Sequence, residues 1–232
     1  MKRFYKEVTV APEGAGWRVL LDGRGIKTAQ GKPQVVPARA LAETMAIEWA
    51  GQGEEINPAM FRFRDLADYS IDIAGPERRA VIAAVLRFAE TDTLCYRADP
   101  DAALHQRQLE VWEPLLTAAE ARWDVHFKRI DGVIHQAQPP ATLARLARAL
   151  EAQDMFTLAA LHTLASLAAS LVIALAALAP GTDAETLWNA ANLEEDWQAE
   201  LWGKDAEAEV LRARRLAEFA GAMRFAELAR AG

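Results

Sequence analysis

The chain has 232 residues, of which 52% are hydrophobic and 25% are charged, so it can build a substantial core and wholesale disorder is excluded. Its net charge of −7 argues against nucleic acid as a partner, because neutralising phosphates requires a basic surface. The single cysteine, Cys95, excludes an internal disulfide and a cysteine-based zinc site, and it suits a reducing compartment.

The N-terminal third is predicted to form a small antiparallel sheet. Apolar and polar residues alternate over residues 4–10, and turn residues separate this segment from the next apolar run. Asp22-Gly23 is typical of a second tight turn. The expected extended segments are residues 4–10, 17–21, 25–29 and 33–37.

The hydrophobic period changes from two to 3.6 near Pro37, which predicts a helix ending at Gly51 and a largely helical remainder. A long amphipathic helix around residues 101–123 is expected to bend at Pro114. A short strand pair is possible around Asp131-Gly132. The predicted fold class is α+β, with a β-rich N-terminal domain in residues 1–70 and a larger all-helical domain in residues 71–232.

Residues 155–179 contain no charged side chain and are long enough to cross a membrane. Leucines occupy one broad side of this segment, while His162, Ser166 and Ser170 form a polar stripe on the other. Aromatic belts and a basic flank after the segment are missing from the sequence. We therefore expect a buried core helix, or a pair broken near Ser170, whose polar stripe meets a closely packed helix.

The sequence offers little sign of enzymatic chemistry. It lacks a phosphate-binding loop, a dinucleotide-binding glycine motif, a zinc-protease motif and a paired-cysteine site. Asp68 and Asp72 lie one helical turn apart, but nearby arginines favour salt bridges over a paired-carboxylate site. No cofactor or metal is therefore expected.

The segment from residue 184 to residue 202 is predicted to form one helix with two apolar faces. Trp188, Gln198 and Trp202 share one face with Glu195, and the flanking Glu194, Asp196 and Glu200 are expected to be solvated. Glu195 is either a core carboxylate paired with an arginine or part of an acidic spot that binds another chain beside tryptophans. The spacing leaves both interpretations open.

Eight segments in fixed order resemble the assembly chaperones of the ATP synthase catalytic head, the F(1) sector, that hold its alpha subunit. Three positions depart from the usual pattern of that family: Phe61 replaces a proline, Ala169 a glycine and Ala118 a tryptophan. The resembling segments are RFYKEVTV, LDGRGIKT, LAETMAIEW, INPAMFRF, TDTLCYR, WEPLL, SLVIALA and LEEDWQAELWG.

The resemblance implies a non-enzymatic chaperone that binds a newly made alpha subunit through apolar surface and releases it during assembly with beta. The important acidic position of the family maps onto Glu195. The implied partner-binding residues are Glu195, Gln198, Trp202, Trp188 and Glu194, and the expected state is a monomer that inserts into no membrane.

The N-terminus has basic residues but no apolar run behind them, so neither a secretory signal nor a long transit segment is predicted. The bacterial cytoplasm is therefore the expected location, whereas eukaryotic members of the family are mitochondrial. The rival functional hypothesis is a small-molecule enzyme that uses the Glu195 carboxylate in a polar pocket.

Overall fold

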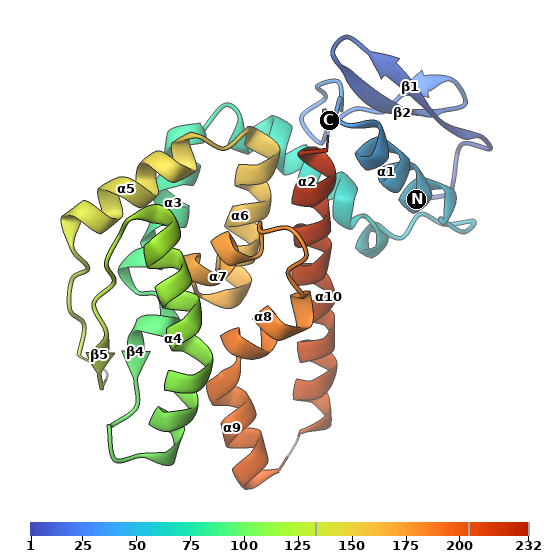
Figure 1. Cartoon of the computed structure of the whole chain (residues 1–232). Helices are drawn as coiled ribbons and strands as arrows, with labels where there is room; N and C mark the ends of the chain where they lie inside the picture. The colour runs from blue at the N-terminus through green and yellow to red at the C-terminus, as the bar shows by residue number, and fades with distance from the viewer. Residues whose placement is uncertain (133, 204, 232) are drawn as a thin grey trace. The chain divides into compact units, whose positions relative to one another are not determined.

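The computed structural model describes residues 1–132, 134–203 and 205–231, and it contains a small antiparallel sheet near the N-terminus and a larger helical portion (Figure 1). This confirms the predicted α+β class. Two compact units are distinguished. The β unit comprises Met1–Arg78, Asp154–Ala160 and Gly221–Gly232, and the helical unit comprises Arg79–Gln153 and Leu161–Ala220. The domain boundary at residue 70 stays a prediction, because these units also group segments that are distant in sequence.

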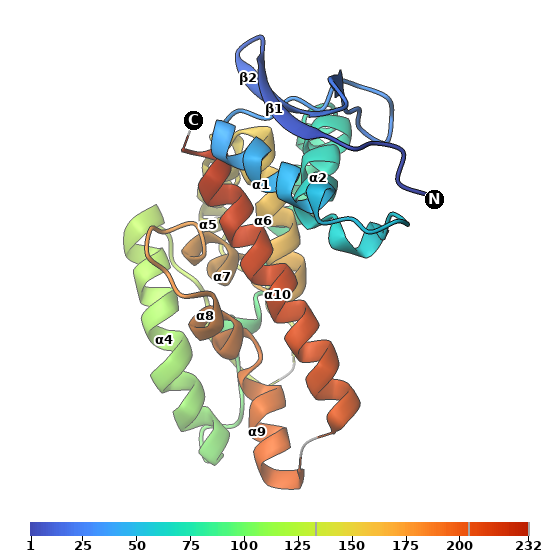
Figure 2. The ribbon, with the colours of Figure 1, turned by 90° about the vertical axis from the view of Figure 1, so that its right-hand side faces the viewer.

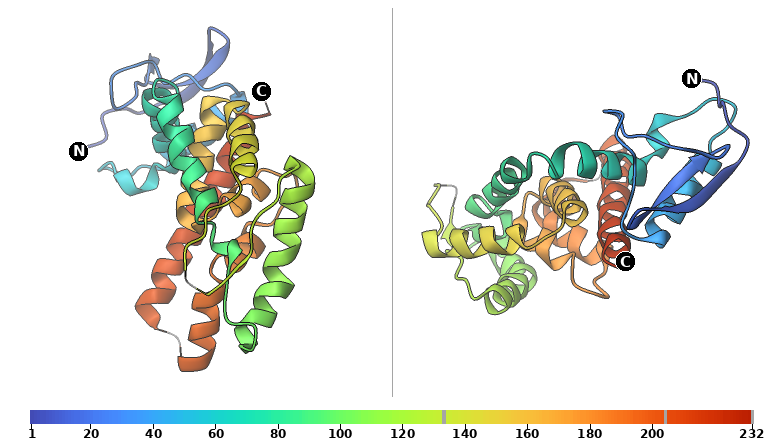
Figure 3. Two further views of the ribbon diagram at one scale, coloured as in Figure 1. Left: turned by 90° about the vertical axis from the view of Figure 1, so that its left-hand side faces the viewer. Right: turned by 90° about the horizontal axis from the view of Figure 1, so that it is seen from above.

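The sheet of the β unit consists of β1 (Val8–Glu13), β2 (Gly16–Leu21) and β3 (Arg24–Gly25), in that order and antiparallel (Figure 3). The first strand begins later than expected, and the third is reduced to two residues. The expected fourth segment contributes isolated bridges, such as the one between Trp17 and Val36. The predicted sheet is thus confirmed in order, with shorter first and third strands and no fourth strand among the described residues.

Helix α1 (Arg39–Ala50) packs against β1 and β2 and completes the core of the β unit. Its residues Leu41 and Met45 are fully buried, as is Val19 of β2. Gly51 is the C-cap residue, and its N–H donates to the carbonyl of Ile47, as the sequence predicts.

Asp68 and Asp72 anchor the loop that follows the sheet. They lie on α2 (Arg62–Tyr69) and on the π-helical turn η2 (Ser70–Ala74), which follow the short helix η1 (Pro58–Met60). Asp72 accepts hydrogen bonds from the Thr28 hydroxyl at 2.8 Å and the Gln30 amide at 3.0 Å. Asp68 accepts from the Ala29 amide and lies 3.5 Å from the Arg64 guanidinium. The expected salt bridging is therefore present, but the main partners of these carboxylates are loop groups.

The helical unit is built around α4 (Ala103–Trp123), which contacts α5, α7 and α9. α4 runs through Pro114 as one helix, with Trp112 and Leu116 fully buried on either side of it, and the bend expected at Pro114 stays a prediction. The remaining elements of the chain, of which α6 and α10 contribute residues to both units, are α3 (Arg78–Glu90), η3 (Thr93–Cys95), β4 (Tyr96–Arg97), β5 (Ile130–Asp131), α5 (Pro140–Glu151), α6 (Met155–Ala168), α7 (Leu171–Ala176), α8 (Ala184–Ala191), α9 (Leu193–Trp202) and α10 (Ala206–Ala229).

The strand pair expected around Asp131-Gly132 is wrong for the part of the chain that the structure describes. β5 instead pairs in parallel with β4, and the Gly132 amide donates to the Arg97 carbonyl at 2.8 Å. A pairing between segments more than thirty residues apart leaves no local turn signal, so it was not visible in the sequence. It adds a two-residue strand pair to a domain expected to be all-helical.

The uncharged segment 155–179 is mainly buried and is divided into α6 and α7, as predicted, with the break at Ala169-Ser170. None of the helices in the described ranges has the length and apolarity to cross a membrane. Ser170 caps α7 by accepting from the Ile173 amide, and Asp92 accepts from the Val172 amide at 2.9 Å. Within the polar stripe, Ser166 is exposed and so does not meet a closely packed helix as expected, whereas His162 is half-buried and Ser170 is buried.

Ala169 occupies a left-handed backbone conformation, with φ of 48°, at a position where the resembling family usually has glycine. This conformation costs a residue with a Cβ atom about 1–2 kcal/mol, whereas glycine loses about 0.5–1 kcal/mol more backbone entropy on folding. Ala169→Gly should therefore raise the free energy of unfolding by about 0.5–1 kcal/mol, measured by urea denaturation.

The matched control is Ala152→Gly, an exposed helix C-cap with φ of −78°. Glycine relieves no strain there and should only destabilise. A loss of stability in Ala169→Gly equal to that in the control would contradict the assignment of strain to Ala169.

Candidate functional site

The segment expected to form one helix from residue 184 to residue 202 is two helices, α8 and α9, which meet at Asn192. The backbone of Asn192 is non-helical, with φ of −107° and ψ of 23°, and its side chain donates to the Trp188 carbonyl at 2.8 Å. Asparagine favours such local bonds to the backbone over helix continuation. The single face predicted to carry Trp188, Gln198 and Trp202 is therefore wrong: Trp188 is buried on α8, whereas Gln198 and Trp202 are exposed on α9.

Helix α9 is held mainly by polar contacts, because Leu193 is its one buried residue. The Arg107 guanidinium of α4 pairs with Glu200 at 2.6 and 2.9 Å and lies 5.6 Å from the centre of the Trp197 ring. On the α10 side, Arg212 pairs with Asp196 at 2.8 Å. Figure 2 shows α9 beside the ends of α4 and α10.

Gln108, which is fully buried, forms a second link between α4 and α9. Its side-chain N–H donates to Glu194 at 2.7 Å, and its side-chain oxygen accepts from the Ala98 amide at 2.8 Å. Burial and the adjacent Glu195 charge raise the pKa of Glu194, while the bond from Gln108 lowers it. Glu194 and Glu200 are exposed, as expected on solvated flanks, and Asp196 is half-buried. All three also help to hold the helix in place through their contacts with Gln108, Arg107 and Arg212.

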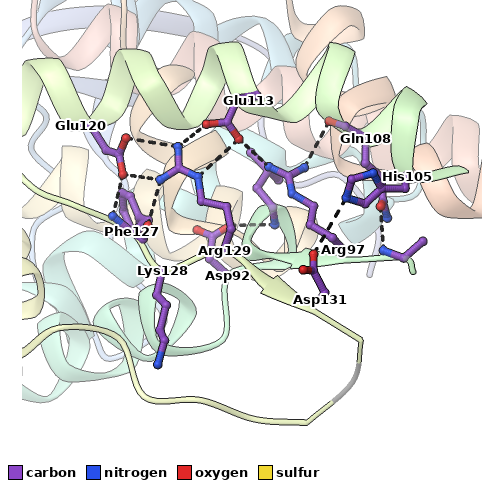
Figure 4. Close-up of polar contacts among 12 residues, drawn as sticks. Asp92, Arg97, His105, Gln108, Glu113, Glu120, Phe127, Lys128, Arg129 and Asp131 are labelled. Atoms are coloured by element: carbon purple, nitrogen blue, oxygen red, sulfur yellow. Dashed lines mark hydrogen bonds and ion pairs between the residues drawn. The ribbon is translucent and has the colours of Figure 1, made fainter. Parts of the chain in front are cut away.

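The Gln108 link continues into a network of charged groups around Glu113, which lies between Arg97 and Arg129 (Figure 4). Arg97 is 3% exposed, donates to the Gln108 carbonyl at 3.1 Å and pairs with Glu113 at 3.0 Å. Arg129 pairs with Glu113 at 2.5 Å and also with Glu120.

Opposite effects act on the two guanidinium groups of this network. Burial lowers the pKa of Arg97. Burial also acts to lower the pKa of Arg129, but hydrogen bonds to Glu120 and Glu113 outweigh this effect and raise it. Sequence analysis missed these residues, although Arg97 and Glu113 lie in two of the resembling segments.

Glu195 lies in a groove of about 220 Å³ between α8, α9 and the beginning of α10. It is exposed, and its side chain forms no hydrogen bond or ion pair with the residues that the structure describes, so its interpretation as an arginine-paired core carboxylate is wrong. The groove is lined by Trp188, Asn192, Glu195, Asp196, Ala199, Asp205, Ala208, Glu209, Leu211, Arg212 and Arg215.

The structure brings Trp188 into the same groove as Glu195, as the sequence predicts for this pair. The buried indole Nε1–H of Trp188 lacks a hydrogen-bond acceptor within the described ranges. Asp196, Asp205 and Glu209 also line the groove. Because Asp196 is engaged by Arg212, Glu195 is the acidic group better placed for an external partner.

Four large apolar side chains are exposed where α9 ends and α10 begins, and we name them the apolar tip. Their exposed fractions are 59% for Leu201, 79% for Trp202, 72% for Val210 and 47% for Leu211. Clustered exposed apolar side chains mark interaction surfaces, and tryptophan is enriched at the centre of interfaces. Leu211 also lines the groove, so this member of the apolar tip lies on the same surface as Glu195.

Comparisons with known proteins identify the class to which this chain belongs. A model of the family described as "ATP12 chaperone protein" matches residues 2–120. "Protein atp12, mitochondrial" from Schizosaccharomyces pombe is 26% identical in an alignment of 214 residues that covers 87% of this chain and 74% of that protein.

Two crystal structures have a similar fold. Atp12 from Paracoccus denitrificans is 36% identical with a TM-score of 0.92, over 98% of each chain. Atu1473 from Agrobacterium tumefaciens is 40% identical with a TM-score of 0.93, over 98% of this chain and 85% of that one. The chain belongs to the ATP12 chaperone family. It is a chaperone of ATP synthase assembly, which confirms the resemblance derived from its sequence.

The contact between Arg107 and Glu200 can be tested by reversing its charges. Arg107→Glu should lower the free energy of unfolding by about 0.5–1 kcal/mol, because the pair is partly exposed and screened by water. The double variant Arg107→Glu/Glu200→Arg should recover part of that loss in urea denaturation. Additive losses in the two single variants and no recovery in the double variant would contradict a role for this pair in holding α9.

Proposed function

We propose that the chain binds the unassembled alpha subunit of the ATP synthase catalytic head and prevents its aggregation until alpha pairs with beta. Membership of a chaperone family supports the general role, and the resemblance of the sequence supports the choice of alpha. The observation that carries the proposal is the apolar tip beside Glu195, a carboxylate without a partner among the described residues.

The apolar tip would supply most of the binding free energy. Burying one large apolar side chain contributes about 1.5–3 kcal/mol, before the cost of association is subtracted. Trp202 is the strongest candidate for the centre of the contact, since it is the most exposed member of the tip. Unassembled alpha exposes the apolar surface that beta later covers, so its chemistry matches that of the tip.

Glu195 would supply direction and selectivity. Its carboxylate can accept from a lysine, an arginine or a backbone N–H of alpha without breaking a contact described within the chaperone. Trp188 lines the same groove and would give it an apolar floor. Beta would release alpha by competing for the same apolar surface, since a partner that binds only free alpha shifts the equilibrium by mass action.

The rival hypothesis of an enzyme using Glu195 has a weaker basis. The groove does contain further carboxylates, but Glu195 is exposed to solvent, and catalytic acids act best in sites from which water is excluded. The bacterial sources of the two matched structures fit a location in the bacterial cytoplasm, which we retain as part of the proposal.

The proposal predicts that Glu195→Lys abolishes protection of alpha and leaves the chaperone folded. Because Glu195 is exposed, the melting temperature should stay within about 2 °C of the wild-type value, as is usual for surface substitutions. Protection is measured by light scattering of alpha diluted from denaturant, with a pull-down of alpha from the same mixture.

The matched control is Glu90→Lys, which makes the same charge change at an exposed position on α3. It should protect alpha as well as the wild-type chain does. Trp202→Ala should weaken protection through the same surface. Normal protection by Glu195→Lys would refute the assigned role of Glu195, and normal protection by both Glu195→Lys and Trp202→Ala would refute the groove and the apolar tip as the alpha-binding site.

A further inference from the structure

A second cavity, of about 480 Å³, lies within the β unit and takes no part in the function proposed above. Its volume falls in the range of ligand-binding pockets. The cavity has an apolar, buried floor and an exposed rim. The floor consists of Tyr5, Leu21, Ile26 and Trp49, and the rim includes Phe4, Asp22, Arg24 and Lys27.

Trp49 provides an unused hydrogen-bond donor in the wall of this cavity. The residue is 9% exposed, and its indole Nε1–H has no acceptor in the part of the chain that the structure describes. The nearby Tyr5 hydroxyl does not fill this role, because it donates to the Trp49 carbonyl at 2.7 Å. Buried indole N–H groups normally find a partner, so an acceptor brought by a ligand would complete this wall once the Trp49 ring turns to expose its N–H to the cavity.

The rim is locally basic in a chain with a net charge of −7. Arg24 and Lys27 are exposed, and neither forms an ion pair within the described residues. Asp22 is engaged by the amides of Lys6 at 3.0 Å and Glu7 at 2.8 Å, and these hydrogen bonds lower the pKa of its carboxyl group. The rim therefore carries two cationic side chains, Arg24 and Lys27, and one carboxylate, Asp22, that already accepts two backbone hydrogen bonds. This balance favours a negatively charged ligand group at the rim.

Phe4 completes the apolar part of the cavity. This ring is 64% exposed and meets the Tyr5 ring edge-on, with 5.3 Å between ring centres. A large aromatic side chain left in water beside an apolar floor gains by covering another apolar group.

We propose that this cavity binds a peptide segment in which a large apolar side chain precedes a carboxylate. The apolar side chain enters between Phe4, Ile26 and Trp49, and the carboxylate pairs with Arg24 and Lys27. A carbonyl or carboxylate oxygen of the segment accepts from the Trp49 indole. A polypeptide is the favoured occupant because the chain is a chaperone, and peptides supply all three groups within a few residues. This second contact is independent of the α9–α10 groove.

Nuclear magnetic resonance of the full ¹⁵N-labelled chain tests this proposal. Indole N–H resonances report each tryptophan separately, and Trp49→Phe assigns the resonance of Trp49. The probes are capped peptides of sequence Gly-Leu-Phe-Glu-Gly, Gly-Leu-Phe-Lys-Gly and Gly-Ala-Ala-Glu-Gly. The first should shift the Trp49 resonance saturably, and the other two should bind at least about fivefold more weakly, as expected for loss of a charge pair or an apolar anchor.

Charge variants provide the control. Arg24→Glu/Lys27→Glu should weaken binding of the Glu peptide at least about fivefold. Arg122→Glu/Lys128→Glu, an equal charge change at exposed positions of the helical unit, should not. Glu195→Lys should bind the peptide normally, which separates this site from the proposed alpha-binding surface. A Trp49 resonance that does not move, equal binding of the Lys peptide, or unchanged binding by the rim variant would overturn the proposal.

Discussion

The position of α9 depends on hydrogen bonds and ion pairs rather than on a buried apolar face. The buried side-chain amide of Gln108 connects the backbone after β4 to Glu194. Arg107, the residue directly before Gln108, connects α4 to Glu200. A buried amide left unpaired would cost about 1–3 kcal/mol, so Gln108 holds both of its partners firmly. Arg97 donates to the backbone carbonyl of Gln108 and pairs with Glu113, so these two residues help to hold Gln108 in position. Through Gln108, this network of charged groups contributes to the position of α9.

Helix geometry explains how three consecutive carboxylates acquire three different roles. Successive residues of an α-helix are separated by about 100°, so neighbours in sequence face different surroundings. Glu194 therefore meets Gln108, Asp196 meets Arg212, and Glu195 remains exposed in the groove. The two flanking residues brace the helix, which allows the central one to change without unfolding it. This separation of bracing from client contact is the core of the proposed function.

Sequence periodicity was sufficient for the parts of the fold that are local. The alternation over the first strands, the change of period near Pro37 and the break near Ser170 each depend on neighbouring residues, and the structure has all three. Non-local pairings were not predictable. The parallel contact of β4 with β5 and the bond from Gln108 to Glu194 join segments that carry no signal for each other.

For the candidate site around Glu195, the sequence predicted which types of residue are present but not how they are arranged. Tryptophans and carboxylates near residue 195 indicated a binding surface, but one asparagine changed its geometry, because Asn192 divides the expected helix and leaves Trp188 buried. Val210 and Leu211 of the apolar tip were missed for a different reason. Their exposure depends on where α10 begins after Gly203, which local pattern did not define.

Hydrogen–deuterium exchange of the chaperone with and without unassembled alpha subunit tests the central claim most directly. The account predicts slower exchange in α9 and in the first turns of α10 when alpha is bound, with the buried middle of α4 unchanged. The reason is that client contact covers the apolar tip and the groove around Glu195 but leaves the helices behind them as they were. Protection confined to other parts of the chain, with α9 and the start of α10 exchanging at the same rate in both samples, would contradict it.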